Sequence, residues 1–134
     1  MTHDTATGLS ATLQHMRSAW QANKPGYAQR RADLKALRAA VKAQLPQMVA
    51  AINTDFGQRS AAESRIAEGM TVLSAIDHLL AHLRDWMRPT PVGAGWRLLP
   101  ARAELRAVPL GVVGVISPWN YPVNLALIPL ATAI

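Results

Sequence analysis

The sequence contains no cysteine, only one phenylalanine and two tyrosines, and no charged residue after Arg106. The lack of cysteine excludes a disulfide scaffold, a cysteine-based zinc site and a thiol nucleophile within these 134 residues. Half of the residues are apolar and 16% are charged, which excludes a disordered chain and indicates a globular one. The opening MTHDTATGLS is polar and lacks a secretory signal, so the sequence predicts a cytoplasmic location.

The net charge of +6 raises the question of an acidic partner such as nucleic acid. The basic residues, Arg30, Lys35 and Lys42 among them, are spread along expected helices between Asp33 and many alanines. No aromatic residues interleave with a basic cluster. This pattern favours solvated helix faces and predicts no nucleic-acid partner.

The uncharged stretch after Arg106 is long enough to raise the question of a membrane span. Four prolines interrupt it, at Pro109, Pro118, Pro122 and Pro129. A single span would leave backbone groups unsatisfied at these breaks, so burial within a soluble domain is the better account. The stretch ends in mid-pattern at PLATAI, which predicts the front part of a longer protein.

Hydrophobic periodicity predicts three helices in the first two thirds of the chain. The first covers about Leu9 to Ala22, and the second begins near Tyr27 and continues to about Ile52 before a turn at NTDFGQRS. The third follows the capping-box pattern Ser60-x-x-Glu63 and runs to about Met87. Its expected inward positions are Ile66, Met70, Leu73, Leu80 and Leu83. We expect the second and third helices to form an antiparallel pair that buries Leu34, Leu37, Val41, Leu73 and Leu80.

Strand-like runs come later. Two short strands are expected near residues 96–99 and 103–108, after a loop at RPTPVGAG. Residues 112–116 are apolar on both faces, as in a buried strand of a parallel sheet, and a helix is expected after Pro122. The order predicts an α/β fold: N-terminal helices and a β-hairpin arm, then the first strand and helix of an incomplete Rossmann-like domain.

Two weak motifs have simpler explanations than a binding site. His78 and His82 are four residues apart on one expected helix, but Leu79 stands where a zinc protease has glutamate, and no third ligand is evident. We therefore predict no metal site. The glycines of GAG at 93–95, and Gly111 with Gly114, do not have the spacing of a dinucleotide-binding loop.

The segment SPWNYP, at residues 117–122, is more informative. Pro118 and Pro122 stiffen the chain on either side of Trp119, Asn120 and Tyr121. A neutral amide held rigidly at the end of a strand is what an oxyanion hole requires. The alternative is that Asn120 only caps the following helix, and on chemistry alone the two interpretations are equal.

The segment PLGVVGVISPWNYPVNLALIPLATAI resembles the aldehyde dehydrogenase superfamily, whose signature here is P-W-N-[FY]-P. NTDFGQRSAAES, LRDWMRP and AELRAVPLGVVG resemble its class 3-like branch, and most closely the bacterial coniferyl aldehyde dehydrogenases. The resemblance covers roughly residues 31–134. It implies oxidation of a small-molecule aldehyde, aromatic and coniferyl-aldehyde-like, to the carboxylic acid with NAD or NADP as the cofactor. It also implies a homodimer for the full-length protein.

The resemblance also implies roles for particular residues. Asn120 matches the asparagine that stabilises the oxyanion formed when a cysteine thiolate attacks the aldehyde. Tyr121 matches an aromatic of the substrate tunnel. The segment that matches the nicotinamide-ribose side of the cofactor site consists of Ile116, Ser117, Pro118 and Trp119.

The family's nucleophilic cysteine, glutamate base and glycine-rich cofactor loop have no counterpart in these 134 residues, so we expect the chain alone to be inactive. The expected division is a helical region at 1–95, a β-strand arm at 96–109 that serves oligomerisation, and the start of an NAD(P)-binding domain at 110–134. Two other readings stay open at this stage. One is a non-catalytic helical interaction module or remnant with a hydrophobic docking tail, and the other is a membrane-associated protein.

Overall fold

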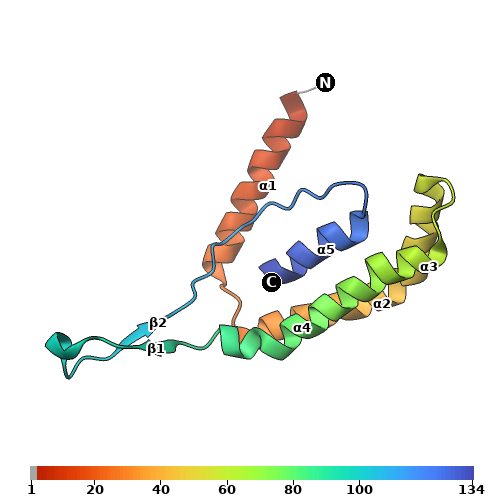
Figure 1. The fold of residues 1–134 in the computed structure, drawn as a ribbon. Coiled ribbons are helices and arrows are strands. Elements are labelled where there is room, and N and C mark those ends of the chain that lie inside the picture. The colour runs from red at the N-terminus through yellow and green to blue at the C-terminus, as the bar shows by residue number, and fades with distance from the viewer. Residues whose placement is uncertain (1–2) are drawn as a thin grey trace.

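The computed structural model describes the chain from residue 3 to 134, with side chains from Gly8 onward. Figure 1 shows a small helical body from which one helix and one hairpin project. The elements in order are α1 (His3–Ala22), α2 (Tyr27–Phe56), α3 (Ala61–Ser64), the π-helix η1 (Arg65–Met70), α4 (Thr71–Trp86), β1 (Thr90–Val92), the 3₁₀ turn η2 (Trp96–Leu98), β2 (Ala103–Leu105) and α5 (Pro122–Ala133).

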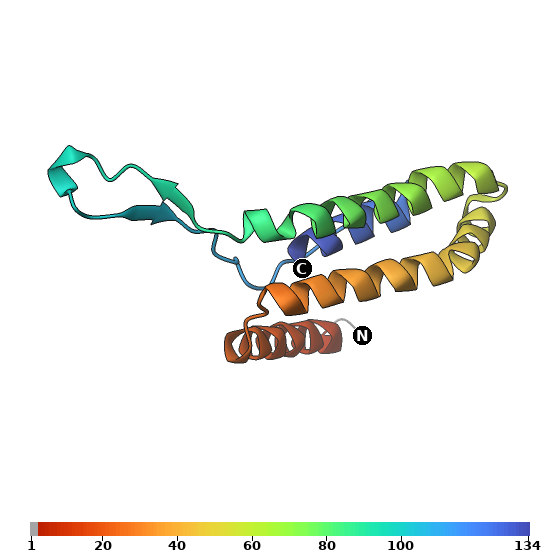
Figure 2. The ribbon, with the colours of Figure 1, turned by 90° about the horizontal axis from the view of Figure 1, so that it is seen from below.

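The core lies between α2 and α4, which run side by side in opposite directions, and α5 covers the seam between them (Figure 2). The predicted antiparallel pair is therefore confirmed. Leu37, Leu73 and Leu80 are half-buried at its margin. The fully buried apolar residues of this cluster are Leu34, Val41, Val72, Ile76, Leu83 and Ala131.

The third predicted helix is present, but its inward face differs from the prediction. Ile66 and Met70 are exposed, with 58% and 61% of their surface accessible. Their positions belong to η1, where the wider π turn shifts the register of side chains relative to an α-helix. Glu68 and Gly69 are buried in their place. Ser60 stands at the start of α3 as expected, although its side chain makes no capping hydrogen bond there.

The turn η1 lies very close to α2. A Cβ atom added to Gly69 would lie 2.5 Å from Cδ1 of Leu45, so only glycine fits without displacing that side chain. The second helix also extends further than predicted, through Phe56, and ends at Gly57 with φ of 60°, a left-handed conformation that glycine adopts readily.

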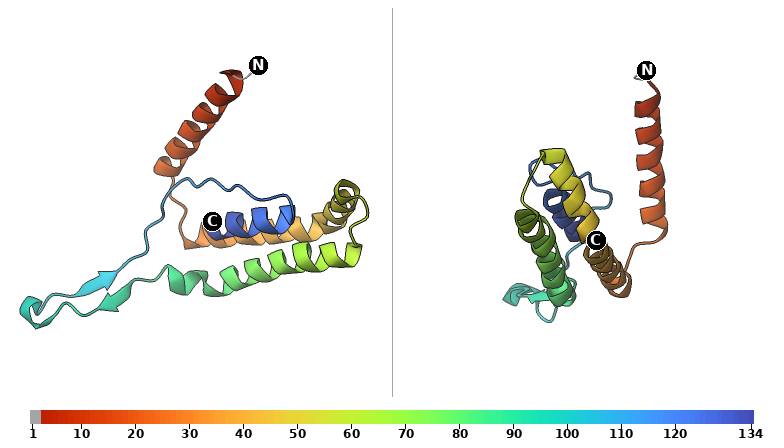
Figure 3. Two further views of the ribbon diagram at one scale, coloured as in Figure 1. Left: turned by 45° about the horizontal axis from the view of Figure 1, so that its top comes forward. Right: turned by 90° about the vertical axis from the view of Figure 1, so that its right-hand side faces the viewer.

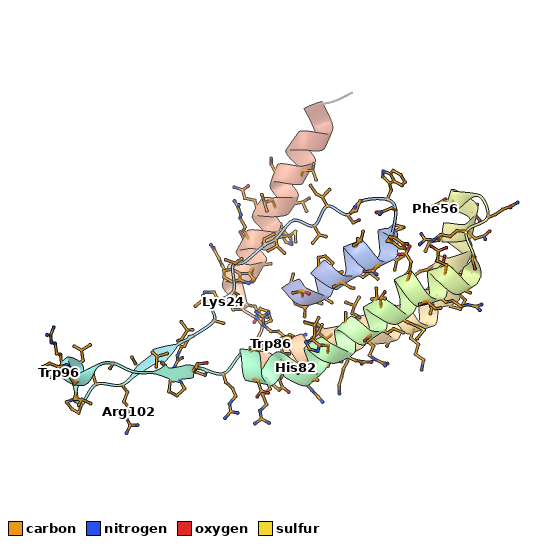
Figure 4. All side chains as sticks on the ribbon, in the orientation of Figure 1. Lys24, Phe56, His82, Trp86, Trp96 and Arg102 are labelled. Atoms are coloured by element: carbon orange, nitrogen blue, oxygen red, sulfur yellow. The ribbon has the colours of Figure 1, made fainter. Side chains whose placement is uncertain are left out.

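The hairpin arm exists, but its strands are shifted from the predicted positions. β1 pairs antiparallel with β2 in the register Thr90↔Leu105 and Val92↔Ala103. The expected strand at 96–99 is instead the 3₁₀ turn at the tip of the hairpin. Trp96 lies there, far from the helices, with Arg102 on the returning side (Figure 4). The first strand begins within the segment that composition had suggested was a loop.

The predicted buried strand at 112–116 is extended chain without strand pairing. Among the described residues, no backbone hydrogen bond joins it to another segment. Ile116 is 99% exposed. A parallel strand needs a neighbour for both its hydrogen bonds and its side-chain faces, and no strand lies beside this one within residues 3–134. We call residues 107–118 the strap, because this segment crosses from the arm to the start of α5 (Figure 1).

Helix α1 stands apart from the other helices, as both views in Figure 3 show. Leu9, Leu13 and Met16, which share one face of this helix, are exposed. Trp20 is half-buried, and its ring lies 3.8 Å from the position that a Cβ on Gly111 would take. Gly111 has φ of 107°, so the strap turns past this ring in a conformation that favours glycine.

Candidate active site

The turn that joins the strap to α5 carries the predicted site residues. It spans residues 119–121, directly before α5 begins at Pro122. Trp119 is 82% exposed, Asn120 is exposed and Tyr121 is half-buried. This turn therefore presents an amide and an indole at the surface, at one end of α5.

Arg59 holds this turn against the helical body. Its Nη1 donates to the backbone carbonyl of Asn120 at 2.9 Å. Its guanidinium carbon lies 4.4 Å from the centre of the Tyr121 ring, a cation–π distance. Only 8% of the Arg59 side chain is exposed, so this contact is largely shielded from water. The same side chain ties the turn to α3, since Nη2 lies 3.1 Å from Oε1 of Glu63.

Glu68 caps α5 from a different helix. Its Oε2 accepts hydrogen bonds from the backbone N–H groups of Val123 and Asn124, both at 2.9 Å. Its Oε1 lies 3.3 Å from Nη1 of Arg59, so the buried carboxylate has a cationic partner. The first residue of α5, Pro122, has no N–H to satisfy. The first amides of the helix are thus satisfied by one carboxylate that is 1% exposed.

The side chain of Asn124 adds a second link between α5 and η1. Its Nδ2 donates to the carbonyl of Ala67 at 2.7 Å and to Oγ1 of Thr71 at 2.9 Å. Together with the bonds from Glu68, these hydrogen bonds fix where the first turn of α5 lies along η1 and how it is rotated about its own axis.

These contacts exclude the capping role for Asn120. The N-cap residue is Tyr121, with no side-chain capping bond, and the acceptor for the helix start is Glu68. Within the described residues, Asn120 contributes only its backbone carbonyl to a hydrogen bond. The helix-cap alternative is wrong, and the exposed amide has both of its N–H donors available for a ligand.

Sequence reasoning missed Arg59, Glu68 and Asn124. One signal was present for Glu68, because it falls in a row of positions four apart with Ser64, Val72 and Ile76, all of them buried. A glutamate in line with buried positions indicates a paired internal charge. For Arg59 the local pattern shows only the pairing with Glu63, four residues on. Its contacts with Glu68 and with the Asn120 carbonyl span 9 and 61 residues, and the sequence gives no signal for them.

The two histidines of α4 are both exposed and lie against each other. Their ring centres are 4.1 Å apart, and Nδ1 of His82 lies 2.8 Å from the carbonyl oxygen of His78. The ring of His82 also stacks on Trp86, on the side of α4 shown in Figure 4. Across the described part of the chain, no group of three potential ligands is placed to hold a metal ion.

The aldehyde dehydrogenase family model matches residues 2–134. The chain belongs to the aldehyde dehydrogenase family. A probable coniferyl aldehyde dehydrogenase of Pseudomonas aeruginosa is 39% identical over 127 residues, which are 94% of this chain and 27% of that relative. Aldehyde dehydrogenase family 3 member B3 of the mouse is 35% identical over 91% of this chain and 26% of its own length. The chain thus spans about a quarter of the length of these curated relatives.

A solved structure, the substrate-bound state of Staphylococcus aureus AldH, superposes with a TM-score of 0.88 at 24% identity. The match covers 93% of this chain and 27% of that one. It confirms the predicted fold class, an incomplete α/β unit with N-terminal helices and a hairpin arm. No helix among residues 3–134 combines the length and the apolar character needed to cross a membrane.

The family is generally NAD(P)-dependent, and these residues fit one part of such a cofactor. The strap presents exposed apolar surface at Ile116 and Pro118, and the turn after it adds the exposed indole of Trp119, a surface of the kind on which a flat ring can pack. The described residues do not fit its phosphates. The start of α5, where a Rossmann-like unit would bind pyrophosphate, is occupied by the Glu68 carboxylate.

Proposed function

We propose that this chain forms part of an NAD(P)-dependent aldehyde dehydrogenase that oxidises an aromatic, coniferyl-aldehyde-like aldehyde to the carboxylic acid. The observation that carries the proposal is the Asn120 amide, which is exposed on a turn whose carbonyl and following helix are both held by other residues. The names of the bacterial relatives support the choice of substrate class.

In this proposal Asn120 Nδ2 donates a hydrogen bond to the aldehyde oxygen as negative charge develops on it. A neutral amide suits this role because it stabilises the oxyanion without giving up a proton. The thiolate that attacks the aldehyde carbon comes from outside these 134 residues, which contain no cysteine. NAD(P), when bound, supplies the hydride acceptor.

The remaining predicted roles follow from the same proposal. Ile116, Ser117, Pro118 and Trp119 flank the nicotinamide-ribose, and Tyr121 contributes an aromatic surface to the substrate tunnel. In the structure the Tyr121 ring packs under Arg59, so its free edge is the part available to a substrate. We further propose the division at 1–95, 96–109 and 110–134, a cytoplasmic homodimer, and a role for the arm in oligomerisation.

The test compares Asn120→Ala with Asn120→Asp in the complete enzyme that contains this segment. Removal of an oxyanion donor should lower kcat by about 10²–10³-fold, with little change in cofactor affinity. Asn120→Asp should be no better than Asn120→Ala, because a carboxylate places like charge beside the oxyanion. Steady-state kinetics with an aromatic aldehyde measure both variants.

Asn23→Ala is the matched control, since Asn23 is exposed and lies in the turn between α1 and α2. It should leave kcat unchanged. Retention of most of the turnover by Asn120→Asp would show that the oxyanion role is wrong.

A further inference from the structure

We propose that Glu68 and Arg59 are positioning residues that hold the Asn120 turn in its productive geometry. The inference rests on the proposed role of Asn120 and extends it to two side chains that contact the backbone of its turn and of the helix that follows. Neither residue is expected to touch the aldehyde; each acts through the turn that carries the amide.

The first step of the argument is electrostatic. A helix start carries a partial positive charge and unsatisfied N–H groups, so a carboxylate placed there is favourable. Glu68 contacts two of these groups, and it is 1% exposed, so the contact is not weakened by solvent screening. A buried carboxylate without a cation would be costly, and Arg59 supplies that cation at 3.3 Å.

The second step concerns where Glu68 itself is held. It lies in η1, next to Gly69, where an added Cβ would lie 2.5 Å from Cδ1 of Leu45 in α2 and would displace that side chain. This close approach fixes η1 on α2. A contact series therefore runs from α2 through η1 and the Glu68 carboxylate to the first amides of α5.

The third step concerns Arg59. The carbonyl that it binds belongs to the peptide between Asn120 and Tyr121, so the hydrogen bond fixes the plane of that peptide. The same guanidinium lies over the Tyr121 ring and so constrains the residue on the other side of the peptide. With Glu68 holding the helix start and Arg59 holding the peptide, the backbone of Asn120 has little freedom to rotate.

The expected effect follows from the distances that catalysis tolerates. A displacement of about 1 Å at a catalytic group can cost about 10²-fold in rate. We expect Glu68→Gln, which keeps the shape but removes the charge, to lower kcat by about 10–10²-fold. Arg59→Lys keeps the charge but loses the forked geometry, and it should act in the same direction.

The experiment uses the complete enzyme and two measurements. Hydrogen–deuterium exchange of the peptide covering residues 119–125 should become faster in Glu68→Gln. Asp55→Asn is the matched control, because Asp55 is an exposed carboxylate of α2 that makes no hydrogen bond to Arg59 or to α5 among the described residues. It should leave both exchange and kcat unchanged.

A double-mutant cycle separates positioning from a merely structural role. If Glu68 acts through Asn120, Glu68→Gln should lower kcat in the natural background and have no further effect in an Asn120→Ala background. An equal loss in both backgrounds, or unchanged exchange and kcat, would overturn the inference. If Glu68→Gln fails to fold, Arg59→Lys is carried through the same cycle and decides it.

The cycle also distinguishes this inference from the proposed function. If Asn120→Ala keeps its turnover, the oxyanion role is wrong, and with it the catalytic positioning. The exchange measurement then still reports whether Glu68 anchors α5. If Asn120→Ala is inactive but Glu68→Gln exchanges and turns over normally, only the positioning inference is lost.

Discussion

The helical body and the strap contain the same types of apolar residue, but these residues differ widely in burial. In the body, Leu34 and Val41 are each 1% exposed and Ile76 is 0% exposed. In the strap, Leu110 is 94% exposed and Ile116 is 99% exposed. Apolar character alone therefore does not bury a residue in this chain.

The difference in burial comes from where each element finds hydrogen-bond partners for its backbone amides and carbonyls. A helix satisfies its amides and carbonyls within itself, so α2, α4 and α5 need only bring apolar faces together. An extended segment needs another strand for its hydrogen bonds and two packed faces for its side chains. The body meets its requirement within residues 3–134, whereas the strap does not. The following predictions test that contrast, in order of expected size.

The largest effect concerns the 134-residue chain expressed alone. It should form no NAD(P)H from an aromatic aldehyde, and it should aggregate through the strap, because unpaired apolar strands associate with one another. Val113→Lys combined with Ile116→Lys should reduce aggregation without changing helical content. Light scattering and circular dichroism measure the two properties.

The control variant is Ala40→Lys combined with Ala43→Lys, which adds the same charge to an exposed face of α2. This variant should aggregate like the parent chain. Equal improvement from both variants would show that net charge, and not the strap, governs aggregation.

The next prediction compares the stability effect of shortening one leucine in the helical body with that of shortening one in the strap. Leu34→Ala should lower the free energy of unfolding by about 2–5 kcal/mol, because it leaves a cavity between α2 and α4. Leu110→Ala removes the same atoms from an exposed position and should change it by less than about 0.5 kcal/mol. Urea unfolding at low protein concentration, followed by circular dichroism, compares them. Similar losses for both would mean that the strap is packed in solution.

The smallest expected effect on stability concerns an ion pair on the surface of the helical body. Nε and Nη2 of Arg38 donate to the carboxylate of Asp77 at 2.6 and 2.9 Å, linking α2 to α4. These hydrogen bonds hold the pKa of Asp77 below its usual value, with the charge of Arg38 a lesser cause. The pair should therefore stabilise the fold at neutral pH and lose this contribution as pH falls through the lowered pKa.

Melting temperatures of the parent and of Asp77→Asn, measured from neutral to acidic pH, test whether the pair loses its stabilising contribution as pH falls. The gap between them should be small at neutral pH, since both side chains are exposed, and should close in acid. Asp85→Asn is the control, because its carboxylate lies 3.9 Å from Arg88 and is 71% exposed. A gap that widens as pH falls would contradict the assignment.

The sequence predicted the helices well because their information is local. The stripe of Leu34, Leu37 and Val41 marks the face of α2 that packs on α4, and Pro122 marks the start of α5. The strands were predicted less well because pairing is not local. Nothing near residues 96–99 indicates that this run forms the tip of the hairpin, while β1 begins at Thr90.

The candidate site was predicted in part. The exposed Asn120 was identified from the rigid segment around it, and the resemblance supplied its role. The side chains that hold it were not identified, because Arg59 and Glu68 meet the turn only after α5 folds back onto η1. Ile66 and Met70 were misplaced because periodicity arguments assume an α-helix, and this stretch is a π-helix.

That π-helix has a consequence for how the family segment can vary in length. A π turn holds more residues than an α turn, so η1 differs from an α-helix by roughly one additional residue. Deleting one residue between Arg65 and Met70 would restore the α-helical repeat and rotate every preceding side chain relative to α4. Relatives that gain or lose a residue here should therefore compensate nearby. The number of residues in η1, as much as their chemistry, specifies which side chain faces the start of α5.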